Sequence, residues 1–73
     1  MPENSTAYGE LAQVIKELPV LVRERRKQDG SSVREAARRI GVAASTVCRV
    51  ETGDLPNGEN MVLILQWLDR GVL

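Results

Sequence analysis

The side chains best suited to recognise another molecule lie together in one stretch of this sequence. Residues 43–52 carry short or polar side chains with one long cation, Arg49, among them. A guanidinium presents its N–H donors in a fixed fork, so Arg49 can donate two hydrogen bonds to one partner. The other candidate contact residues of this stretch are Ala44, Ser45, Thr46, Cys48 and Thr52.

The residue types argue against catalysis and metal binding. The sequence contains no histidine, so Ser–His and Cys–His nucleophile pairs are impossible and the commonest general base is missing. One cysteine cannot form an internal disulfide, and without histidine there is no zinc ligand set. We therefore expect a binding protein and not an enzyme, without cofactor or metal, in a reducing cytoplasmic setting.

The formal net charge is zero, but the charges are unevenly distributed. Residues 20–50 hold eight cationic side chains against three acidic ones, a net charge of +5. Residues 1–19 carry −2 and residues 51–73 carry −3. A basic middle between acidic ends suggests a cationic face directed at a polyanion, although a solvated helical surface would give the same pattern.

The 73 residues suffice for a single domain spanning 1–73. No apolar run approaches the length of a transmembrane helix, and the first residues do not resemble a signal peptide. No stretch alternates cleanly as a strand would, whereas helical spacing recurs throughout. We expect an all-α fold, a compact bundle of four to five short helices.

Apolar residues at helical spacing predict a first helix over 6–18, capped by Ser5 or Thr6. Pro19 then favours a break and a second helix over 19–28, because proline is tolerated in a first turn and disruptive inside a helix. The alternative is one long helix kinked at Pro19.

Further capping residues predict where the remaining helices begin and end. Gly30 suits a helix end, and Ser32 with Glu35 forms a capping box that opens a helix over 33–39. Gly41 separates it from a helix over 44–51. Asn57 can cap a last helix over 58–69.

Residues 32–53, which read SVREAARRIGVAASTVCRVETG, carry a family resemblance. This stretch resembles the helix-turn-helix of the lambda-repressor-like (XRE, Cro/CI type) regulators. Ala37 supplies the small residue that two crossing helices need, and Gly41 can adopt the left-handed turn. We expect the following side chains to point inward and hold the angle: Ala36, Ile40, Val42, Val47 and Val50.

The resemblance implies how such a protein would bind double-stranded DNA. The helix over 44–51 would enter the major groove, with Arg49 reading a guanine edge. The groove-facing residues would be Ala44, Ser45, Thr46, Cys48, Arg49 and Thr52. Ser32, Arg34 and Asn57 would contact phosphates, because they lie at helix starts where free N–H groups point outward.

The resemblance also implies a structural role for Arg26, which would pair with Glu51 and not contact DNA. Three positions depart from the family pattern: Val33 stands where glutamine is common, Ser31 where an apolar residue is common, and Ala43 where serine usually caps the recognition helix. The helix over 6–18 is extra, and we expect it to pack where the family's fifth helix would.

The last helix carries more apolar residues than one core-facing stripe can use, which favours a partner surface. We expect a homodimer on a palindromic operator, with the interface at Trp67, Leu68, Val72 and Leu73. A covering role for the first helix would instead leave a monomer. The implied function is a Cro-like or repressor protein of phage or bacterial origin, with no small-molecule ligand and no membrane partner. The alternative is a protein-binding module of the same fold, such as an antitoxin or adaptor.

Overall fold

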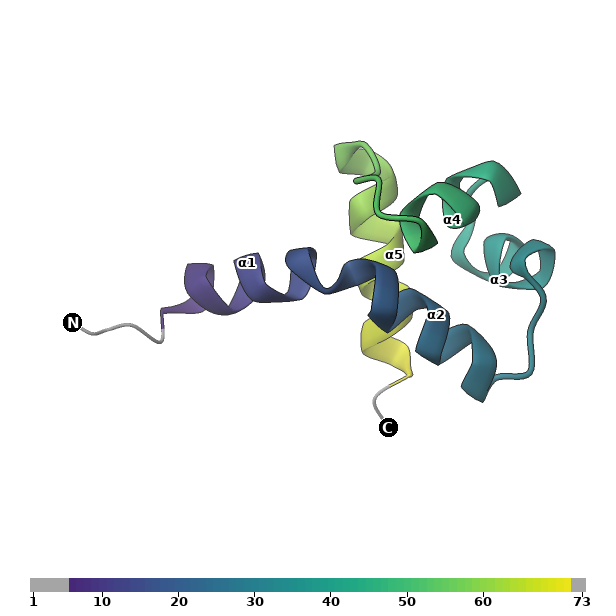
Figure 1. Ribbon diagram of the computed structural model, residues 1–73, viewed down its shortest axis with the longest axis horizontal. Coiled ribbons are helices and arrows are strands. Elements are labelled where there is room, and N and C mark those ends of the chain that lie inside the picture. Colours follow the sequence, from purple (N-terminus) through teal and green to yellow (C-terminus); the bar gives the residue numbers. More distant parts are fainter. Residues whose placement is uncertain (1–5, 72–73) are drawn as a thin grey trace.

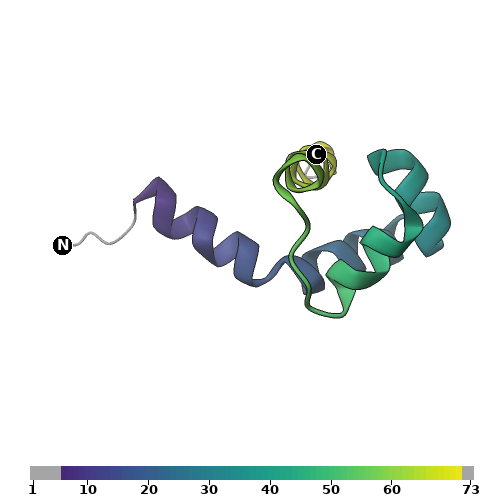
Figure 2. The same ribbon diagram turned by 90° about the horizontal axis from the view of Figure 1, so that it is seen from above.

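The computed structural model describes residues 6–71, and these residues form helices and no strand. The fold is all-α, as the sequence predicts. Four helices pack together and the first extends away from them (Figures 1 and 2). The helices are α1 Ala7–Lys16, α2 Leu18–Gln28, α3 Val33–Ile40, α4 Ala44–Glu51 and α5 Gly58–Arg70.

The first two helices are separate, in agreement with the break predicted at Pro19. Glu17 alone lies between them, with φ −94° and ψ 5°. Its backbone carbonyl accepts hydrogen bonds from the N–H groups of Val20 and Leu21, both at 3.0 Å. Pro19 occupies the first turn of α2, where its missing N–H costs nothing because that group would have no partner inside α2.

The connection from α2 to α3 follows its capping residues. Gly30 adopts a left-handed φ of +66°, and its N–H donates to Lys27 O at 3.0 Å while Ser31 N donates to Arg26 O at 3.0 Å. These paired bonds are a Schellman motif. The predicted capping box follows, because Glu35 N donates to Ser32 Oγ at 3.1 Å and Ser32 N donates to Glu35 Oε1 at 2.8 Å.

The core lies among α2, α3, α4 and α5. Its buried apolar side chains are Leu18, Val22, Ala36, Ala37, Ile40, Val47, Val50, Ile64 and Trp67. Each of these helices buries the apolar residues that lie on one of its faces. Short helices therefore suffice to enclose this core.

The expected dimer interface requires a correction at Trp67. This side chain is only 2% exposed and is the largest fully buried one in the described residues, so it belongs to the core and not to a partner surface. Leu68 is half-buried, and Val72 and Leu73 lie outside the described residues. α5 packs against α2 and α3 and buries Ile64 and Trp67. The sequence of α5 is apolar on nearly all sides, so it does not by itself show which side chains face the core.

The expectation that the first helix replaces a fifth helix of the bundle is wrong. None of the residues of α1 is buried, and the helix projects from one end of the molecule (Figures 1 and 2). The alternative that α1 covers α5 is wrong for the same reason. In residues 6–71, no helix is long and apolar enough to cross a membrane.

Candidate nucleic-acid interface

The turn between α3 and α4 brings these two helices into close contact. Gly41 adopts a left-handed φ of +97°, which a residue with a side chain rarely takes. Its N–H and that of Val42 both donate to Ala37 O, at 2.8 and 3.0 Å. Ala36 and Ala37 are buried, and their small side chains let α4 approach α3. The arrangement is a helix-turn-helix.

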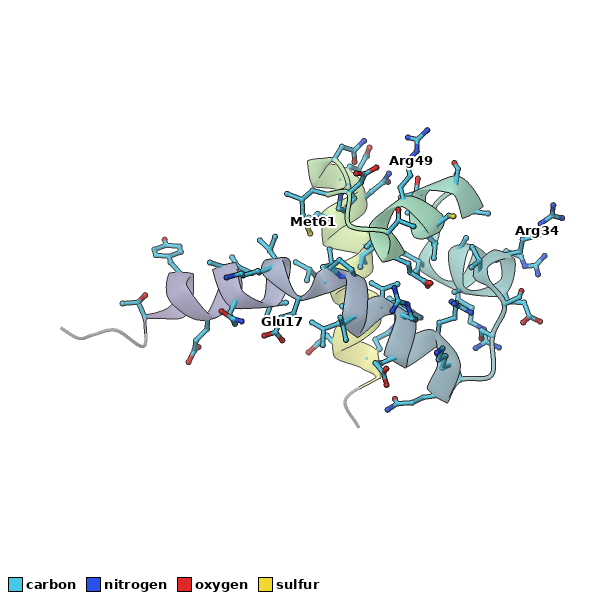
Figure 3. All side chains as sticks on the ribbon, in the orientation of Figure 1. Glu17, Arg34, Arg49 and Met61 are labelled. Atoms are coloured by element: carbon cyan, nitrogen blue, oxygen red, sulfur yellow. The ribbon has the colours of Figure 1, made fainter. Side chains whose placement is uncertain are left out.

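One side of α4 is held against the bundle and the other faces solvent. Val47, Val50 and Glu51 are buried. The predicted contact residues Ser45, Cys48, Arg49 and Thr52 are exposed, whereas Ala44 and Thr46 are half-buried. Arg49 points away from the molecule (Figure 3). The helix therefore offers a surface of short side chains with one long cation.

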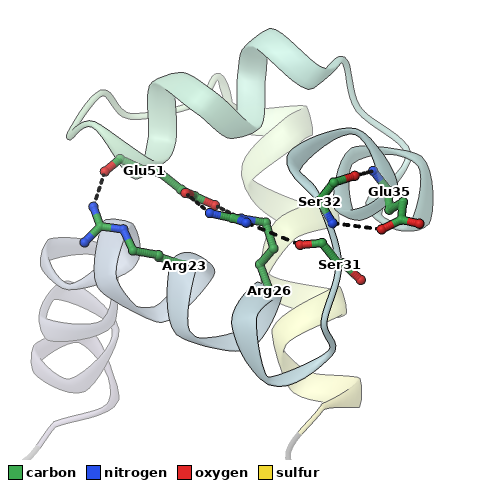
Figure 4. Close-up of polar contacts among 6 residues, drawn as sticks. All are labelled: Arg23, Arg26, Ser31, Ser32, Glu35 and Glu51. Carbon is green, nitrogen blue, oxygen red and sulfur yellow. Dashed lines mark hydrogen bonds and ion pairs between the residues drawn. The ribbon is translucent and has the colours of Figure 1, made fainter.

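The buried end of α4 is anchored by the expected pair of Arg26 and Glu51 (Figure 4). Arg26 Nε lies 2.7 Å from Glu51 Oε2, and Arg26 Nη2 lies 2.9 Å from Glu51 Oε1. The two side chains are 20% and 9% exposed. The hydrogen bonds to the Glu51 carboxylate raise the pKa of Arg26 above its usual value, and the nearby charge acts in the same direction, against the effect of burial.

Arg26 also links this end of α4 to the start of α3, since its Nη1 donates to Ser31 O at 3.3 Å. Arg23 Nη2 donates to Glu51 O at 2.9 Å, which supplies a partner for a carbonyl near the C-terminus of α4. α4 is thus fixed to α2 by two arginines, of which the sequence analysis assigned a structural role to Arg26 alone (Figure 4).

Arg25 is another cation of α2 that makes contacts inside the bundle. Its guanidinium lies 4.6 Å from the centre of the Trp67 ring and donates to Trp67 O. This contact joins α2 to α5 across 42 positions in the sequence. The spacing of residues within one helix does not predict this contact, because its two members lie in different helices.

Three cations of the helix-turn-helix face solvent. Within the described chain, the side chains of Arg34, Arg38 and Arg49 make no internal hydrogen bond or ion pair. Arg39 differs, because its Nη1 donates to Ser31 Oγ at 3.1 Å. Arg34 and Arg49 project outward from α3 and α4 at separate points of the surface (Figure 3). A ligand that meets both must be an extended anion.

A polar hollow of about 310 Å³ separates α4 from the start of α5. Thr46, Arg49 and Asn57 line it together, so three of the predicted contact residues come from two elements to one place. Asn57 Oδ1 accepts from Asn60 N at 2.8 Å, which leaves the amide N–H₂ group of Asn57 able to donate. Asp54 adds one carboxylate to the same hollow.

Comparison with known proteins agrees with this geometry. A helix-turn-helix family model of the lambda-repressor-like (XRE) class matches residues 22–70. The chain belongs to the lambda-repressor-like helix-turn-helix family. This is a family of DNA-binding regulators. No curated protein and no solved structure shows significant similarity to the chain.

The family match begins within α2 and leaves α1 outside it. Inside the match, the departures from the family pattern have structural counterparts. Val33 packs against the core, so it replaces a polar contact by an apolar one. Ala43 has the extended backbone of a cap residue, φ −71° and ψ 149°, but makes no side-chain hydrogen bond to α4.

At the start of α3, the hydroxyl group of the capping residue Ser32 can still donate a hydrogen bond to a ligand. Ser32 Oγ accepts from Glu35 N, so its hydroxyl hydrogen is free to donate outward. The Ser32 backbone N–H lowers the pKa of Glu35, and the Ser32 hydroxyl and the charges of Arg39 and Arg38 act in the same direction, whereas desolvation opposes them. Thr52 differs, because its hydroxyl donates to Arg49 O at 2.9 Å and can only accept from a ligand.

Proposed function

We propose that this protein is a sequence-specific double-stranded DNA-binding transcription regulator that inserts α4 into the major groove. The observation that carries the proposal is the anchoring of α4. Its Glu51 end is tied to α2, while Ser45, Cys48 and Arg49 face outward from a rigid support. A major-groove helix needs this combination of short side chains, one long reader and a fixed orientation.

Arg49 is the proposed reader of sequence. Its exposed guanidinium can donate two hydrogen bonds to the O6 and N7 atoms of a guanine. Ser45 would bond a base edge or a phosphate, Thr46 a phosphate or a thymine methyl group, and Ala44 a thymine methyl group. Cys48 would be a small groove-facing residue that permits close approach of the α4 backbone.

Phosphate contacts would frame this helix on both sides. Ser32 and Arg34 lie in the first turn of α3, and Asn57 lies at the start of α5, where free backbone N–H groups favour anions. These contacts would position the protein without reading sequence.

The proposed assembly is a homodimer on a palindromic operator, because two copies related by a two-fold axis read two inverted half-sites. It would act as a Cro-like or repressor protein that covers a promoter, without a small-molecule ligand. Its place of action would be the cytoplasm of a bacterium or of a phage-infected cell.

The test is selection of binding sites from random duplex DNA, followed by binding of wild type and Arg49→Ala to the selected site. We expect a palindromic site. Arg49→Ala should lose about 1–3 kcal/mol of binding free energy and accept other bases at one guanine position.

The matched control is Arg70→Ala, which removes an exposed arginine at the C-terminal end of α5. It should bind the selected site like wild type. Failure to enrich any sequence at low salt would overturn the proposed function and direct the search to a protein partner. Equal losses for the two variants would show that Arg49 acts only through its charge.

A further inference from the structure

α1 carries an apolar stripe that the rest of the described chain covers only at Ile15, which is half-buried. Residues at helical spacing place Tyr8, Leu11, Val14 and Ile15 on one face, opposite Gly9 and the polar side chains of this helix. Tyr8 is 84% exposed and Leu11 45%. Exposed apolar residues arranged along one helix face mark a contact surface.

The helix is also too short to be stable by its own hydrogen bonds. It has ten residues, and isolated helices of this length are marginal in water. Its local support consists of the Thr6 cap, which accepts from Gly9 N at 3.1 Å, and a side-chain bond between Gln13 and Glu17. Packing of the stripe against another surface would supply the missing stabilisation.

An apolar corner lies directly beside this stripe. It is a groove of about 460 Å³ between the α1–α2 junction and the C-terminal half of α5. Its apolar lining comes from Val14, Leu21, Leu65 and Leu68. Val14 belongs to both the stripe and the corner, so the two form one continuous surface on each molecule.

The area available identifies a second copy of this chain as the occupant. A ten-residue helix is about 15 Å long and about 11 Å across, so inserting half its circumference covers roughly 250 Å² of helix and a similar area of groove. One inserted helix therefore buries roughly 500 Å² in total, well below the roughly 1,000 Å² of a specific interface. Two copies that exchange α1 reach that threshold, because each supplies both a stripe and a corner.

We propose that two copies of this protein form a two-fold dimer in which each α1 packs into the α1–α5 corner of the other. The contact is isologous, since the same stripe and corner are used twice and the assembly closes. α1 and the helix-turn-helix lie at opposite ends of the molecule (Figure 1). Asn57 caps the N-terminus of α5, whereas the corner is lined by the C-terminal half of this helix. The exchange leaves the proposed DNA contacts free.

The experiment is sedimentation velocity without DNA over a hundredfold range of micromolar concentrations. Wild type is expected to reach twice its monomer mass of 8.1 kDa at the upper end. Leu11→Glu places a charge in the stripe and should raise the dissociation constant roughly a hundredfold, because the carboxylate would be buried without a partner. Leu11 lies outside the core, so the bundle keeps its helices.

The matched control is Gly9→Glu, which adds the same charge to the same helix on its polar face and should remain dimeric. Hydrogen exchange provides a second measurement: the amides of α1 should be protected in the dimer and lose that protection on dilution, while those of α3 and α4 should not.

A monomeric wild type throughout the range would overturn the proposal. So would a Leu11→Glu variant that dimerises like wild type, or equal dissociation by both variants. The dimer is inferred from the surface alone, whereas its use on paired half-sites rests on the proposed function. Because sedimentation contains no DNA, its failure would leave the site-selection result standing.

Discussion

At the scale of single residues, six of the eight arginines of this chain fall into two groups with different roles. Arg23, Arg25 and Arg26 donate to atoms of α4 and α5 and hold the bundle together. Arg34, Arg38 and Arg49 face solvent from the helix-turn-helix. A count of charges does not separate the arginines that donate inside the bundle from those that α3 and α4 present to a polyanion.

The pair of Arg26 and Glu51 provides a residue-scale prediction for stability. Glu51→Gln removes the charge and one acceptor from a nearly buried carboxylate while keeping the side chain's shape. The free energy of unfolding should fall by about 2 kcal/mol, since a hydrogen bond between charged groups is lost and Arg26 stays partly buried. Urea denaturation at a fixed protein concentration measures it.

The control for that measurement is Glu59→Gln, which neutralises an exposed glutamate and should change the unfolding free energy by less than about 0.5 kcal/mol. If both variants unfold like wild type, the pair makes no net contribution to stability. α4 would then be held by the buried Val47 and Val50 and by the hydrogen bond from Arg23 to Glu51 O.

At the scale of the helix, the two members of the helix-turn-helix begin differently. α3 starts with a complete capping box, in which Ser32 and Glu35 satisfy each other's backbone donors. α4 starts at Ala43, which has the geometry of a cap without a side-chain acceptor. The first turn of α4 therefore keeps free N–H groups that water or a phosphate can satisfy.

Ala43→Ser tests this difference. Ala43 is exposed and already has an extended backbone, so serine can accept a hydrogen bond from the first turn without rearrangement. We expect the free energy of unfolding to rise by about 1 kcal/mol. Thermal or urea unfolding measures it, with Ala12→Ser in the interior of α1 as a control that gains no cap. An unchanged or lower stability would show that the start of α4 is already satisfied.

At the scale of the whole molecule, a formally neutral protein presents a local cationic surface. The outward-facing arginines Arg34, Arg38 and Arg49 all lie on α3 and α4, whereas Arg23, Arg25 and Arg26 of α2 donate inside the bundle. α1 and the α1–α5 corner lie away from this region (Figure 1). Binding of an extended anion and self-association therefore use different ends of the molecule.

This distribution predicts the salt dependence of DNA binding. Neutralisation of a phosphate by Arg34 in each copy should contribute about −1 per copy to the slope of log affinity against log salt concentration. Arg34→Ala should weaken binding to all sequences alike and reduce the slope by about one. Fluorescence anisotropy titrations at several salt concentrations measure both, with Arg70→Ala as the unchanged control. A slope near zero would indicate an apolar interface in place of phosphate contacts.

The sequence alone predicted the features that depend on neighbouring residues. The helix bounds follow from capping residues, from Pro19 and from apolar spacing, all of which act through hydrogen bonds and sterics within a few positions. The turn at Gly41 and the outward set on α4 follow in the same way. The family resemblance supplied the Arg26 and Glu51 pairing, which the structure shows with two hydrogen bonds.

Only the tertiary structure decided the features that join distant segments. Trp67 lies in the core, and Arg25 binds it from a position 42 residues away. The direction of α1 is equally non-local, because its apolar stripe would suit either its own bundle or a partner. Packing chooses between such alternatives through the shape and area of the whole surface, and a periodic pattern within one helix does not carry that information.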